Sequence, residues 1–97
     1  MSIVDRRKLL SEIALYILEE LAVRGGKVKA KYLRSYRALR FWAGDKTAEE
    51  VLKRLIEANY IKIENNYIVL IRPISTRRSL KQIESMAISV AKSLHEG

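Results

Sequence analysis

Residues 47–71, TAEEVLKRLIEANYIKIENNYIVLI, decide the fold because their hydrophobic pattern changes from the period of a helix to that of a strand. Val51, Leu52 and Leu55 recur at three- and four-residue spacing, and charged side chains occupy most of the positions between them. This pattern predicts a helix over residues 47–59 with one buried stripe and one solvated side.

Two polar signals predict where this helix begins and ends. Thr47 and Glu50 have the spacing of a capping box, in which each side chain accepts a hydrogen bond from the backbone N–H of the other residue. Asn59 is the expected end, because Asn is second only to Gly in tolerating the left-handed conformation past a helix C-terminus.

The alternation of residues 60–71 predicts a β-hairpin directly after the helix. Asn65 and Asn66 both tolerate positive φ, so a two-residue type I′ turn would pair Glu64 with Tyr67. This register places four aliphatic side chains on one face: Ile61, Ile63, Ile68 and Leu70. We expect that face to pack on the helices.

Length and charge limit the class of protein. The 97 residues predict one domain with a modest core, and 19 Lys and Arg against 11 Asp and Glu give a net charge of +8. This charge favours a polyanionic partner, with nucleic acid first among them. The lack of Cys excludes disulfides and cysteine-based sites. No apolar run has the length of a membrane span, so we expect no membrane partner and a cytoplasmic location.

A first helix is expected over residues 2–23, with Ser2 and Asp5 in cap positions and Gly25 as its stop. Its inward stripe is Leu10, Ile13, Ala14, Ile17, Leu18 and Leu21. Further apolar residues widen this surface beyond what one contact needs. We therefore expect the C-terminal helix, or a partner subunit, to cover a second side.

The segment of residues 24–40, which we call the basic segment, has the largest charge asymmetry in the chain. Its seven cations, with no acidic residue among them, are Arg24, Lys27, Lys29, Lys31, Arg34, Arg37 and Arg40. A short strand over residues 27–30 should lead into a helix that turns Tyr32, Leu33, Tyr36 and Leu39 inward. Either this helix ends near Arg40, or the Arg40 side chain extends from the apolar side to solvent. Because these like charges repel one another, we interpret the segment as a contact for an anionic ligand; the alternative is a solubilising surface.

Phe41 and Trp42 follow the basic segment, in the expected turn between two helices. The main interpretation is that they plug the core at that corner. The alternative is that the Trp stacks on a nucleobase or anchors a protein partner.

The expected order of helix, strand, helix, helix and hairpin resembles the winged helix-turn-helix family, over about residues 6–71. The pattern LKRLIEANYIKIENNYIVLI at residues 52–71 is similar to the third helix and wing of archaeal and bacterial transcription regulators. The resemblance implies a mainly α fold with a β-hairpin wing, and residues 47–59 as recognition helix in the major groove. The nucleic-acid-binding set would be Lys27, Lys29, Lys31, Arg34, Arg37, Arg40, Lys46, Thr47, Glu49, Lys53 and Lys62.

Two features of this chain depart from the family pattern and favour binding without base readout. Glu49 and Glu50 occupy groove-facing positions of the expected recognition helix, where phosphates repel carboxylates. Asn65 and Asn66, rather than basic residues, form the wing tip. The leading hypothesis is a double-stranded DNA-binding regulator or architectural protein. The alternative is a protein-docking module within a larger nucleic-acid-handling assembly.

A final helix is predicted over residues 79–95, as part of a single domain divided into a winged-helix body (1–74) and a C-terminal element (75–97). Its heptad seam is Leu80, Ile83, Ala87, Val90 and Leu94. Two heptads are short for an independent coiled coil. We therefore expect the seam to pack partly on the first helix and partly across the two-fold axis of a homodimer, as in small archaeal winged-helix proteins, which this chain resembles.

Catalysis has little support in the sequence. The single His95 lies near the C-terminus, and no glycine-rich phosphate loop is present. Adjacent acids at positions 19–20 and 49–50 are expected on solvated helix faces. We therefore expect a non-enzyme without cofactor or metal.

Overall fold

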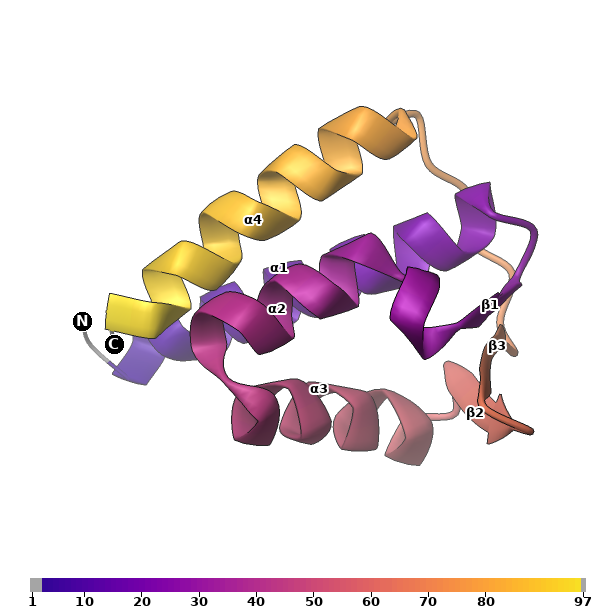
Figure 1. Cartoon of the computed structure of the whole chain (residues 1–97), viewed down its shortest axis with the longest axis horizontal. Helices are drawn as coiled ribbons and strands as arrows, with labels where there is room; N and C mark the ends of the chain where they lie inside the picture. Colours follow the sequence, from indigo (N-terminus) through magenta and orange to yellow (C-terminus); the bar gives the residue numbers. More distant parts are fainter. Residues whose placement is uncertain (1–2, 97) are drawn as a thin grey trace.

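The computed structural model describes residues 3–96 as a mainly helical fold with a small antiparallel sheet, which is compatible with a winged helix (Figure 1). The elements are α1 (Ile3–Val23), β1 (Lys27–Lys29), the 3₁₀ turn η1 (Ala30–Tyr32), α2 (Arg34–Ala43), α3 (Asp45–Glu57), β2 (Ile61–Glu64), β3 (Tyr67–Leu70) and α4 (Leu80–Glu96). The expected order of elements is therefore present. The caps expected at Ser2 and Asp5 fall outside the residues whose side chains are described.

The helices surround one core, and the sheet closes it at one end (Figure 1). α2 contacts α1, α3 and α4, and α4 also packs along α1. This arrangement confirms that the C-terminal helix covers a second side of α1. Its predicted inward stripe is buried, except for Ala14, which is half-buried.

The hairpin forms in the predicted register. Asn65 and Asn66 have φ of 50° and 72°, and Glu64 pairs with Tyr67. β3 is central and also pairs with β1, giving the order β1-β3-β2. The prediction that the whole aliphatic face is covered is wrong for Ile63, which is 52% exposed. β2 is an edge strand, and Ile63 lies towards its turn.

The connection between α2 and α3 is one residue, Gly44, and the predicted capping box is wrong. Gly44 has a φ of 96° and is both the C-cap of α2 and the N-cap of α3. Only glycine adopts such a conformation without strain, so the cap of α3 lies three residues before the expected position. Thr47 lies inside α3 instead of capping it, whereas Asn59 has the expected positive φ of 63°.

The end of α2 differs from the prediction for Phe41 and Trp42, whereas the Arg40 side chain is 52% exposed, as the alternative for that residue expects. The helix continues past Arg40 to Ala43, so Phe41 and Trp42 lie in its last turn, and Phe41 is 78% exposed. Trp42 is half-buried against the core, so only one of the two aromatic residues contributes to it. Tyr32 is exposed because residues 30–32 form the 3₁₀ turn η1 rather than a turn of α2.

α4 begins with a capping box that the sequence analysis missed. The Ser79 hydroxyl accepts a hydrogen bond from the N–H of Gln82 (3.2 Å), and the Gln82 side chain accepts one from the N–H of Ser79 (2.8 Å). The predicted seam is buried within the chain except for Leu80, which is half-buried, and Ile83 and Ala87 are fully inaccessible. A homodimer stays a prediction, and one formed without moving α4 would use other residues.

Candidate nucleic-acid interface

A buried carboxylate holds the basic segment in place. Glu20 of α1 is inaccessible to solvent, and its Oε1 accepts hydrogen bonds from the N–H and the hydroxyl of Ser35, both at 2.7 Å. Its Oε2 accepts from the N–H of Arg34 (2.8 Å) and from Nε of Arg24 (2.7 Å). Leu33 precedes α2 without a side-chain cap. Glu20 therefore supplies from α1 the cap that the local sequence lacks.

The neighbouring acid, Glu19, fixes the linker to α4. Both of its oxygens accept from Nη1 of Arg78, at 2.9 and 2.8 Å, and the Arg78 guanidinium lies 5.4 Å from the ring centre of Tyr16. The prediction that Glu19 and Glu20 are solvated is wrong, because both are nine-tenths or more buried. They are structural acids with arginine partners.

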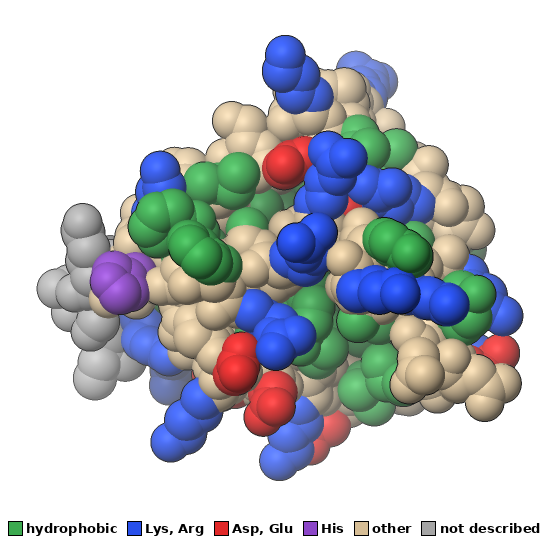
Figure 2. Space-filling view, in the orientation of Figure 1, with side chains coloured by type: hydrophobic (Ala, Val, Ile, Leu, Met, Phe, Trp, Pro, Cys, Tyr) green, Lys and Arg blue, Asp and Glu red, His purple; other side chains and the backbone are tan. Residues whose placement is uncertain are grey.

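The exposed side of α2 carries three arginines at three-residue spacing. Arg34 pairs with Glu84 of α4 at 2.9 Å, and Arg40 pairs with Asp45 of α3 at 3.1 Å. Hydrogen bonds from these guanidinium groups to their acids raise the pKa of both arginines. Arg37 lies between them and makes no ion pair with any described side chain. In Figure 2, blue side chains gather over α2, with red ones among them near α3.

Acids outside the basic segment neutralise part of its charge. Glu20 pairs with Arg24, and Glu64 lies 4.0 Å from Lys27, in addition to the two pairs on α2. Within residues 3–96, three cations of the segment lack a carboxylate within ion-pair distance: Lys29, Lys31 and Arg37. The uncompensated charge is therefore smaller than the sequence predicted, and its three cations lie one each on β1, η1 and α2.

Aromatic rings accompany the lysines of this surface. The ammonium groups of Lys27 and Lys29 lie 4.8 and 5.6 Å from the ring centre of Tyr67 on β3. The Lys31 ammonium lies 5.1 Å from the ring centre of Tyr32. These contacts orient the lysines while leaving Lys27 and Lys31 exposed.

The predicted recognition helix presents mixed charge. Lys46, Glu49 and Lys53 are exposed on α3, and Thr47 is half-buried. On the hairpin, Lys62 pairs with Glu64 of the same strand at 2.9 Å, and this hydrogen bond lowers the pKa of Glu64. The structure thus places the predicted residues on two surfaces: a basic one on β1, η1 and α2, and a mixed one on α3 and β2.

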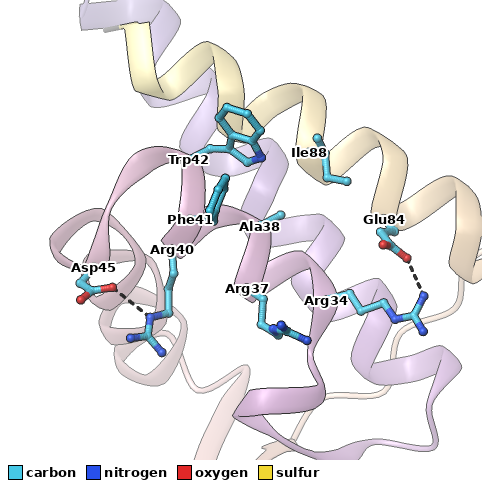
Figure 3. Close-up of a pocket in the computed structure, with 9 residues that line it drawn as sticks. All are labelled: Arg34, Arg37, Ala38, Arg40, Phe41, Trp42, Asp45, Glu84 and Ile88. Carbon is cyan, nitrogen blue, oxygen red and sulfur yellow. Dashed lines mark hydrogen bonds and ion pairs between the residues drawn. The ribbon is translucent and has the colours of Figure 1, made fainter.

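A shallow groove of about 670 Å³ lies between α2 and α4. Figure 3 shows Arg34, Arg37 and Arg40 along α2, Phe41 and Trp42 at the end of that helix, and Glu84 and Ile88 on α4. Arg34 points to Glu84, whereas Arg40 points to Asp45. Phe41 contacts Trp42 edge to face, with ring centres 5.1 Å apart. The groove was not predicted from the sequence, where only Trp42 was a candidate for stacking and Phe41 was expected in the core.

Two other kinds of site are not found in the described part of the chain. No cluster of three or more His, Cys, Asp or Glu side chains that could hold a metal ion occurs among those residues. None of the described helices combines the length and apolar character needed to cross a membrane. Comparison of the chain with family models, curated proteins and solved structures found no match.

Proposed function

We propose that this chain is a winged helix-turn-helix protein that binds double-stranded DNA, as a small regulator or an architectural protein. The contact is made by the basic surface of β1, η1 and α2, and it is directed at phosphates. α3 contributes little base readout, because its exposed Glu49 lies between the exposed Lys46 and Lys53 and would be repelled by phosphates. The observation that carries the proposal is the run of Lys29, Lys31 and Arg37 without carboxylate partners.

The two ion pairs on α2 do not oppose this role. The side chains of Arg34 and Arg40 are both about half exposed, at 54% and 52%. Exposed ion pairs contribute only about 0 to 1 kcal/mol, so a phosphate can replace either acid at little cost. Binding by the three free cations predicts a slope of log affinity against log salt of about −2.7, and participation of both paired arginines increases it to about −4.5.

A titration of a random-sequence duplex at several salt concentrations tests the proposal. Fluorescence anisotropy of the labelled duplex gives the affinity at each concentration. We expect affinity to fall with salt at a slope between these two values and to vary little with sequence. If the wild-type protein binds no duplex at low salt, the proposal is wrong and the protein-docking alternative is favoured.

A further inference from the structure

The groove between α2 and α4 has a composition that phosphate binding to a duplex does not explain. A strongly exposed aromatic residue, Phe41, stands beside three arginines, although a solvated phenylalanine is unfavourable. The adjacent Trp42 is half-buried, and the Lys92 ammonium lies 4.8 Å from its ring centre. Phe41 is therefore the aromatic residue of this groove that remains available to a ligand.

The geometry of the aromatic pair leaves a ring face of Phe41 open. The planes of Phe41 and Trp42 meet at 83°, so the edge of one ring meets the face of the other. Whichever ring supplies the edge, at least one face of Phe41 is not covered by Trp42. That face can stack on a flat aromatic ligand, and nucleobases of every kind offer such a surface.

Three arginines that could contact phosphates share α2 and the groove lining with Phe41. Arg37 precedes Phe41 by four residues, which makes their side chains neighbours on the surface of α2. Arg34 and Arg40 extend the charge along the same helix, each oriented by an acid at the groove edge. Base stacking and phosphate contacts are thus available within one groove.

We propose that the groove between α2 and α4 binds unpaired nucleotides of single-stranded DNA. Phe41 stacks on a base, and Arg34, Arg37 and Arg40 contact the flanking phosphates. An acidic peptide would also meet the arginines, but its carboxylates would leave the open ring face of Phe41 without a partner. A protruding ring with an open face suits a base better.

The test compares two 12-mers of equal charge, dT12 and an abasic strand with the same sugar-phosphate backbone. Trp42 is the chain's single tryptophan and lies beside Phe41, so its fluorescence reports on the groove. We expect dT12 to quench this fluorescence and to bind more tightly than the abasic strand. Three phosphate contacts predict a salt slope of about −2 for dT12.

Variants of Phe41 test stacking while the three arginines stay unchanged. Phe41→Ala should weaken dT12 binding by about 5- to 150-fold, the range for one stacked base, and Phe41→Tyr should retain it. Leu15→Ala, which truncates an exposed residue on α1, is the matched control and should bind as the wild type does. Because Phe41 is exposed, its replacement leaves the core intact.

Three results would overturn this inference: equal affinity for dT12 and the abasic strand, no change in Trp42 fluorescence, or binding of a poly-Glu 12-mer as tight as that of dT12. The inference does not depend on duplex binding. A protein that binds dT12 but no duplex would refute the proposed function alone, and one that binds duplex but treats both 12-mers alike would refute the inference alone.

Discussion

Glu20 should be the single most important polar residue for stability. Glu20→Ala removes the acceptor of four hydrogen bonds and leaves the N–H groups of Arg34 and Ser35, and the Ser35 hydroxyl, without their partner. Ser35 is fully buried, so water cannot take the place of the carboxylate without opening the structure. Arg24, whose side chain is 24% exposed, can instead turn towards solvent.

The expected magnitude follows from these contacts. An unsatisfied buried donor costs about 1 to 3 kcal/mol, and loss of a helix N-cap costs about 0.5 to 2 kcal/mol. These penalties overlap, because two of the donors belong to the cap itself. We therefore expect Glu20→Ala to lower the free energy of unfolding by about 3 to 5 kcal/mol, in line with other broken buried ion pairs. Glu20→Gln keeps the shape and one oxygen acceptor but loses the charge, so it should cost about half as much.

Urea unfolding followed by circular dichroism measures both effects, with the exposed Glu57→Gln as matched control. The control should lie within about 0.5 kcal/mol of the wild type. In a domain of this size, 3 kcal/mol corresponds to a fall in Tm of roughly 12 to 24 °C. A Glu20→Gln variant as stable as the control would refute the reasoning, because it would mean that the carboxylate does not hold α2.

Three further predictions address the turn, the seam and the hairpin. Gly44→Ala should lower the free energy of unfolding in urea by about 1 to 3 kcal/mol, because a φ of 96° strains any other residue even though there is free space for a methyl group. A variant as stable as the wild type would contradict this. Ile83→Asp should unfold the monomer, at a cost of at least about 3 kcal/mol, whereas the control Ser85→Asp, on the exposed side of α4, should stay folded. If light scattering shows that Ile83→Asp converts a dimer into a folded monomer, the seam is a subunit contact after all. Lys62→Met should raise the pKa of Glu64 towards its ordinary value in an NMR titration. Because the pKa of Glu64 is lowered in the folded state, the ion pair stabilises the protein above the pKa of Glu64 in the unfolded chain, and this contribution is lost as pH falls through the pKa of Glu64 in the folded protein.

Local signals predicted most of the helices and strands. The hairpin followed from Asn65 and Asn66 and from the alternation of residues 60–64, both of which are properties of neighbouring residues. α4 followed from its heptad spacing to within one residue at each end. The one-residue connection at Gly44 was missed, because Thr47 and Glu50 offered an equally local but weaker start for the helix.

The site was predicted less well because acids outside the basic segment pair with it. Glu84 lies 50 positions from Arg34, so no count of local charge can reveal that pair, and Asp45 pairs with Arg40 from just beyond the end of the segment. The burial of Glu20 did have a readable signal: it lies three residues after Ile17 and seven after Ile13, on the buried stripe of α1. A carboxylate on such a stripe, together with a helix lacking its own cap, indicates a cap supplied by another element.

The proposal of DNA binding is tested most directly by the salt dependence of duplex binding in single-charge variants. Arg37→Ala and Lys31→Ala should each flatten the slope of log affinity against log salt by about 0.9, with every duplex sequence weakened alike. Lys8→Ala removes the same charge from the exposed surface of α1 and should leave the slope unchanged. Wild-type slopes in the Arg37 and Lys31 variants, or equal flattening by Lys8→Ala, would contradict a phosphate contact through β1, η1 and α2.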